Sequence, residues 1–188
     1  MRADLVTLSA CESGVNQLRP GDELFGLMRA LIYAGTPSVI MSLWSVDEIS
    51  SSVLMKKFYE ALQDGKTKVE ALQIAQLAVK DMTASDAILY CEQAATLLDK
   101  AGQHQYRQLI LRDIANLRFQ ARDFAAAKLA YESLLASAEP DSEEYSSLDA
   151  AITRCNRMTR RGESLDYKTR VYERPFHWAP FVLVGDWK

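Results

Sequence analysis

Histidine and cysteine are scarce in this chain, which has two of the first and three of the second. The cysteines, Cys11, Cys91 and Cys155, are odd in number and lack the spacing of metal ligands. These counts argue against a disulfide framework and against a zinc site. We therefore expect no metal and no cofactor.

An excess of positive charge and long apolar runs are also absent. The net charge is −3, whereas nucleic-acid binding depends on clustered Lys and Arg. No window approaches the roughly 18 apolar residues of a membrane span. No basic and then apolar leader precedes Leu5. The composition predicts a cytoplasmic protein that binds neither nucleic acid nor membrane.

The most informative stretch of the sequence is residues 5–14, LVTLSACESG. An apolar, β-type run breaks at Cys11 into a small turn that contains glycine. A strand end holds a thiol rigidly, and the following turn can direct backbone N–H groups at the oxyanion that forms when a thiolate attacks a carbonyl. The alternative is that Cys11 is a small buried hydrophobic residue at the end of a core strand.

The first third of the chain alternates between strand and helix patterns. Residues 5–9 and 37–43 are short apolar runs typical of buried strands, and residues 24–32 between them carry apolar residues at helical spacing. Such a strand-helix-strand unit predicts a right-handed parallel crossover, with Cys11 at the carboxyl edge of the sheet. Two further helices are expected at about residues 47–62 and 67–80.

Several blocks in this region occur together in the order of a known family: GDELFGL at 21–27, RAL at 29–31, AG at 34–35, SLWSVD at 42–47 and WAPFVLVGD at 178–186. With the SACESG motif around Cys11, they resemble the CHAT domain, a caspase- and separase-like cysteine peptidase family of clan CD. The resemblance covers residues 3–82 and 175–187. It implies an α/β fold with a caspase-like, mainly parallel sheet and flanking helices.

The resemblance also implies a Cys-His dyad whose histidine lies upstream of the cysteine. None of the ten residues before Cys11 is histidine. We expect His177 to pack in the closing-strand block and His104 to be solvated in a polar connection between helices. The chain is therefore predicted to be the C-terminal part of a peptidase domain, inactive by itself. The backbone N–H of Cys11 would supply half of the oxyanion hole.

Acidic residues that follow the second predicted strand bear on substrate preference. In the related separases an acidic pocket receives a basic P1 side chain, and Asp47 and Glu48 occupy the corresponding neighbourhood here. The resemblance therefore implies that these two residues bind substrate. Asp47 is equally a good N-cap for the following helix, and the two roles are compatible.

Roughly ninety residues separate this region from the closing strand, and residues 114–132 resemble a tetratricopeptide (TPR) repeat. Small residues at Ala115 and Ala127 permit two antiparallel helices to approach, and Tyr131 fills the gap to the next helix. We predict a nucleophile-bearing part at 1–82, a TPR-like helical insertion at 83–172 and a closing strand at 173–188.

Three functions are compatible with these patterns. The first is a CHAT-type cysteine endopeptidase, a hydrolase acting on a protein or peptide, represented by the part that bears Cys11. The second is a pseudoprotease or regulatory protein that binds a protein partner through the TPR-like helices. The third is a helical adaptor in which the strand-helix-strand unit only supports the repeat. The first strand also lacks a neighbour on one side, so we expect an upstream fragment or a homodimer to pair with it.

Overall fold

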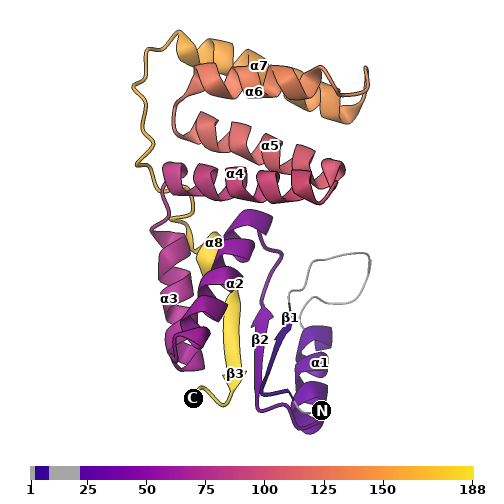
Figure 1. The fold of residues 1–188 in the computed structure, drawn as a ribbon, viewed down its shortest axis with the longest axis vertical. Helices are drawn as coiled ribbons and strands as arrows, with labels where there is room; N and C mark the ends of the chain where they lie inside the picture. Colours follow the sequence, from indigo (N-terminus) through magenta and orange to yellow (C-terminus); the bar gives the residue numbers. More distant parts are fainter. Residues whose placement is uncertain (1–2, 9–21) are drawn as a thin grey trace. The chain divides into compact units, whose positions relative to one another are not determined.

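The computed structural model describes residues 3–8 and 22–188 (Figure 1). The chain divides into two compact units, Met1–Asp81 with Tyr172–Lys188, and Met82–Val171. We call the first the sheet unit and the second the helical unit.

The sheet unit contains a three-stranded sheet with the order β1-β2-β3, formed by β1 (Leu5–Leu8), β2 (Ser38–Ser42) and β3 (Phe181–Gly185). Strands β1 and β2 are parallel, with Thr7 opposite Ile40. Helix α1 (Asp22–Tyr33) makes the connection between them. The predicted parallel pairing of these two strands is confirmed.

The prediction of a caspase-like, mainly parallel sheet is wrong. Among the described residues there are eight helices and three strands, and β3 pairs with β2 antiparallel. Strand β3 follows the short helix α8 (Pro175–Trp178) and starts where β2 ends, because Leu43 N donates to Pro180 O at 2.8 Å. Most of the chain between β2 and β3 forms helices instead of adding strands. The described fold is mainly helical, with a small mixed sheet.

Helices α2 (Glu48–Gln63) and α3 (Lys68–Lys80) pack against each other and cover one face of the sheet (Figure 1). Two hydrogen bonds join them to the sheet: one between the hydroxyls of Thr7 and Tyr59 at 2.9 Å, and one from Gln76 Nε2 to Phe181 O at 3.1 Å. All five residues of β2 are buried. The largest fully buried side chains of this unit include Phe58, Phe181, Ile40, Met41 and Leu54.

The helical unit consists of α4 (Ala84–Lys100), α5 (His104–Gln120), α6 (Phe124–Leu135) and α7 (Glu143–Thr159), each packed on the next (Figure 1). Side-chain caps begin three of them: Thr83 for α4, Asp123 for α6 and Ser142 for α7. Its buried cluster comprises Ala115, Phe124, Ala127, Tyr131, Leu134, Leu148 and Cys155. The cluster includes Ala115, Ala127 and Tyr131, which the sequence predicts at contacts between helices.

The two ends of the helical unit lie side by side. Val171 N donates to Met82 O at 3.2 Å, and Thr83 forms an antiparallel bridge with Arg170. The returning segment is anchored on α6, since the Tyr167 hydroxyl donates to the carboxylate of Asp123. The helical unit therefore begins and ends at neighbouring points, as an insertion into a host domain does.

Candidate functional site

Cys11 and its backbone N–H lie outside the described residues. The described strand β1 ends at Leu8, three residues before Cys11 in the sequence. Because β1 and β2 are parallel, the carboxyl ends of both strands meet at one edge of the sheet. We call this the carboxyl edge, and the other predicted site residues are described relative to it.

The carboxyl edge is built from the exit of β2 and the short helix α8. Trp44 Nε1 donates to Phe176 O at 3.0 Å, and the two rings stack at a centroid distance of 6.4 Å. Leu43 and Trp44 remain 47% and 36% exposed. An apolar, partly open surface therefore lies next to the exit of β2. Helix α8 and its contact with Trp44 were not predicted from the sequence. Pro175 at the start of α8 was the available signal for the helix, although not for the contact.

Asp47 caps helix α2. Its backbone is extended, with φ −69° and ψ 135°, and its Oδ1 accepts the Ser50 N–H at 2.8 Å. Glu48 is exposed in the first turn of the same helix, where its negative charge suits the helix dipole. The capping role of Asp47 is thus confirmed, whereas substrate binding by Asp47 and Glu48 stays a prediction.

The two histidines lie in different surroundings. His177, in α8, packs its ring against Tyr172 and Phe176 at centroid distances of 5.1 and 5.4 Å. Its Nδ1 is buried and has no hydrogen-bond partner among the described residues. The side chain of His104, at the start of α5, is 79% exposed, with Nδ1 4.0 Å from Asp99. The expectations of packing for His177 and solvation for His104 are both confirmed.

Cys91 and Cys155 are core residues of the helical unit. Their exposed fractions are 1% and 0%, and neither forms a disulfide. Burial raises the pKa of the Cys155 thiol, which disfavours the reactive thiolate. Neither sulfur has the solvent access that a nucleophile needs.

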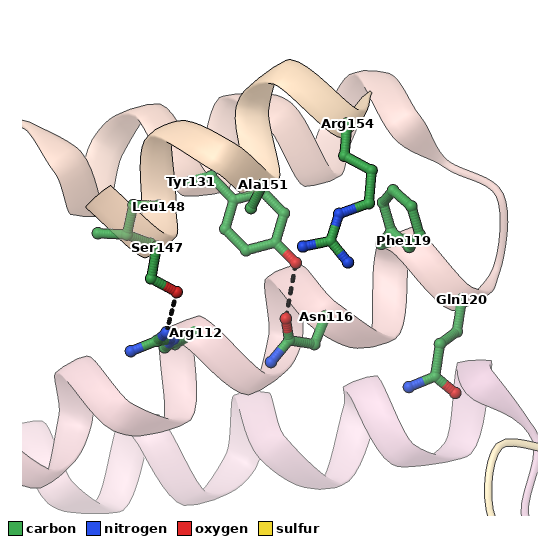
Figure 2. A pocket seen from close by; sticks show the side chains of 9 residues that line it. All are labelled: Arg112, Asn116, Phe119, Gln120, Tyr131, Ser147, Leu148, Ala151 and Arg154. Carbon is green, nitrogen blue, oxygen red and sulfur yellow. Dashed lines mark hydrogen bonds between the residues drawn. The ribbon is translucent and has the colours of Figure 1, made fainter. Parts of the chain in front are cut away.

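A cavity of about 300 Å³ lies within the helical unit, between α5, α6 and α7 (Figure 2). It is lined by Arg112, Asn116, Phe119, Gln120, Tyr131, Ser147, Leu148, Ala151 and Arg154. The sequence identified Tyr131 as filling the gap to the next helix. It did not identify Arg112 and Asn116 as part of a cavity, because their proximity to α7 depends on how three helices pack.

The family model described as the CHAT domain matches residues 1–186, which is nearly the whole chain. This chain belongs to the CHAT domain family. The assignment confirms the resemblance noted from the motifs around Cys11 and at residues 178–186, and it relates the chain to a peptidase family. No curated protein and no solved structure matches the chain.

Within the described ranges 3–8 and 22–188, none of the helices has the length and apolarity to span a bilayer. Likewise, these ranges hold no group of three or more His, Cys, Asp or Glu side chains arranged to bind a metal ion.

Proposed function

We propose that this CHAT domain is the nucleophile-bearing part of a caspase-like cysteine endopeptidase, with Cys11 as the nucleophile. The observation that carries the proposal is the family match over residues 1–186. The parallel pairing of β1 with β2 supports it, since strand ends at the carboxyl edge of an open α/β sheet are where ligands bind.

A cysteine thiol with its usual pKa of about 8.5 needs a neighbouring base to become a thiolate at neutral pH. In the proposed reaction the Cys11 thiolate attacks the scissile carbonyl and the backbone N–H of Cys11 donates to the resulting oxyanion. His104 is exposed in the helical unit, and the half-buried ring of His177 packs against Tyr172 and Phe176. The base is therefore proposed to come from outside these 188 residues, and the chain by itself is proposed to be inactive.

Among the described strands, β1 lies at the edge of the sheet, where a strand that carries the proposed base could pair. Strand β1 pairs with β2 along one side, and no described strand pairs with its other side. We propose that a strand bearing the histidine, from an upstream fragment, completes the sheet there. Pairing with a second copy of the chain is the alternative, because an open strand edge exposes unpaired N–H and C=O groups.

The proposed substrate is a protein or peptide with a basic P1 residue. Asp47 and Glu48 follow the exit of β2 and bring two carboxylates to this part of the sheet unit. Asp47 retains its capping bond to Ser50 in this role. The reaction requires no cofactor, and the proposed location is the cytoplasm.

The test is a peptidase assay with fluorogenic peptides that carry Arg or Lys at P1. The chain is assayed alone and after mixing with the polypeptide encoded immediately upstream. We expect no turnover by the chain alone, and turnover in the mixture that Cys11→Ala abolishes. Turnover by the chain alone that Cys11→Ala abolishes would contradict the proposal that the base lies elsewhere.

A second candidate function is a pseudoprotease or regulatory module that binds a protein partner through TPR-like helices. The observation that favours it is the helical unit itself, a compact group of four long helices whose ends meet. Absence of turnover in the mixture, together with partner binding that Cys11→Ala leaves unchanged, would favour this function over the peptidase.

A further inference from the structure

The cavity between α5, α6 and α7 gathers hydrogen-bond donors from three helices. Arg112 Nη2 donates to Ser147 Oγ at 2.8 Å, and the Tyr131 hydroxyl donates to Asn116 Oδ1 at 2.7 Å (Figure 2). The second bond fixes the orientation of the Asn116 amide and leaves its NH₂ group as a donor. The guanidinium of Arg154 lies over the Phe119 ring, 5.7 Å from its centroid.

The side chains that line this cavity carry positive charge only. None of the described residues that line it is acidic, and two of them are arginines. Burial raises the pKa of Tyr131 to about 12, although the positive charges of Arg154 and Arg112 oppose the shift. The tyrosine hydroxyl therefore remains a donor at neutral pH. Both arginines line the same cavity as this hydroxyl.

A second cavity in the helical unit, lined in part by α4 and α5, provides a comparison. It also contains two arginines, but each is paired with a carboxylate of the chain. Arg107 lies 2.7 Å from Asp99, and Arg118 lies 3.6 Å from Glu92. The positive charge of that cavity is neutralised internally, whereas the lining of the first cavity supplies no counter-charge.

We propose that the cavity between α5, α6 and α7 binds a carboxylate from an acidic segment of a partner protein. The planar guanidinium groups of Arg112 and Arg154 match a carboxylate in geometry and charge, and Asn116 adds a neutral donor. The volume of about 300 Å³ accommodates an acidic side chain or a chain terminus. This inference goes beyond the peptidase proposal and does not rest on Cys11.

An acidic protein segment fits this site better than a nucleic acid does. The chain carries a net charge of −3, and a phosphate backbone is bound by many clustered cations rather than by two arginines in one cavity. Phe119 and Leu148 add apolar lining, which suits a peptide that presents both carboxylates and hydrocarbon.

The proposal is tested by fluorescence anisotropy with the full 188-residue chain and a fluorescein-labelled peptide of alternating Glu and Leu. The neutral control is the same peptide with Gln in place of Glu. We expect the Glu peptide to bind and the Gln peptide not to bind. Arg112→Gln or Arg154→Gln should raise the Kd of the Glu peptide by about tenfold or more, since hydrogen bonds to charged groups contribute strongly. Tyr131→Phe should also weaken binding, because it frees the Asn116 amide from its fixed orientation.

The matched control is Arg157→Gln, which removes the same charge from an exposed position of α7 outside the cavity lining. It should change the Kd by less than about twofold. Three outcomes would overturn the proposal: no binding of the Glu peptide, equal weakening by Arg157→Gln, or equal binding of the Gln peptide. Equally effective competition by a single-stranded oligonucleotide of the same charge would also overturn it. Far-UV circular dichroism verifies that each variant is folded.

Discussion

Asp47 links the exit of β2 to the start of α2, and its carboxylate accepts the backbone N–H of Ser50. An N-cap involves only a residue and the first turn that follows it, so the sequence was sufficient to predict this bond. A role in substrate binding depends in addition on what lies across the carboxyl edge. The two roles are separable by substitution, because asparagine caps a helix nearly as well as aspartate but carries no charge.

We predict that Asp47→Ala lowers the free energy of unfolding by about 1 kcal/mol, the usual value of a side-chain N-cap. Asp47→Asn should retain most of the stability while reducing any preference for a basic P1 residue. Urea denaturation monitored by tryptophan fluorescence measures the first effect. Glu48→Gln is the control, and a loss of stability as large as that of Asp47→Ala would contradict the capping argument.

Tyr131 gives a pH-dependent prediction at the same scale. Its pKa is raised from 10.0 to about 12 in the folded chain, chiefly by burial. As the pH rises from 10 to about 12, the unfolded chain loses this proton before the folded chain does, so the contribution of Tyr131 to stability falls. At neutral pH this contribution is complete, and Tyr131→Phe should cost about 1 kcal/mol through its lost hydrogen bond.

The stability difference between the original chain and Tyr131→Phe should therefore shrink above pH 10. Urea unfolding followed by far-UV circular dichroism at neutral pH and at a pH of about 11 measures it. A difference that stays constant or grows over this interval would be inconsistent with a protonated, buried hydroxyl.

Among the elements, the pairing of β2 with β3 depends on a close backbone approach at Gly185. This residue has φ +102°, and a Cβ atom there would lie 2.1 Å from Pro37 O. Next to it, Asp186 N donates to Pro37 O at 2.8 Å, and Ser38 Oγ donates to Asp186 O at 2.6 Å. The end of β3 is thus held against the start of β2 by contacts that only glycine permits.

Gly185→Ala should consequently destabilise the sheet unit by about 2 kcal/mol or more, through the clash and the strained φ. Gly26→Ala is the matched control, because Gly26 lies inside helix α1 and a Cβ atom added there would have no neighbour within 4 Å. That change should be neutral or stabilise by up to about 1 kcal/mol. Urea midpoints for the two variants test the contrast, and similar midpoints would argue against the close approach.

At the scale of the whole molecule, the helical unit leaves and rejoins the chain at hydrogen-bonded neighbours. Thr83 and Arg170 form an antiparallel bridge, and Val171 N donates to Met82 O. The three tryptophans, Trp44, Trp178 and Trp187, all belong to the sheet unit. Tryptophan fluorescence therefore reports on that unit alone.

We predict that replacing residues 84–169 by a short Gly-Ser linker leaves the sheet unit folded. The two ends of the helical unit are already adjacent, and the entropic cost of closing a loop depends only weakly on its length. The tryptophan emission maximum should match that of the full chain, while helical circular dichroism falls. Emission typical of an unfolded chain would show that the helices belong to the core of the sheet unit.

The sequence alone was sufficient for the elements that short-range physics determines. Helices α1, α2 and α3 follow from apolar spacing. The Asp47 cap and the parallel pair β1–β2 follow from local patterns and a short crossover. The SACESG motif around Cys11, together with the blocks at 21–47 and 178–186, identified the family. Cys11 itself stays a prediction, since it lies outside the described residues.

Only the tertiary structure decided the direction of β3, the small size of the sheet and the composition of the cavity. Strand β3 enters antiparallel because α8 and Pro180 bring it to the end of β2, a contact between residues far apart in sequence. Arg112, Tyr131 and Arg154 line one cavity for the same reason, since they come from three helices. Helical periodicity predicts which residues face inward, but the packing of the helices determines which side chains meet.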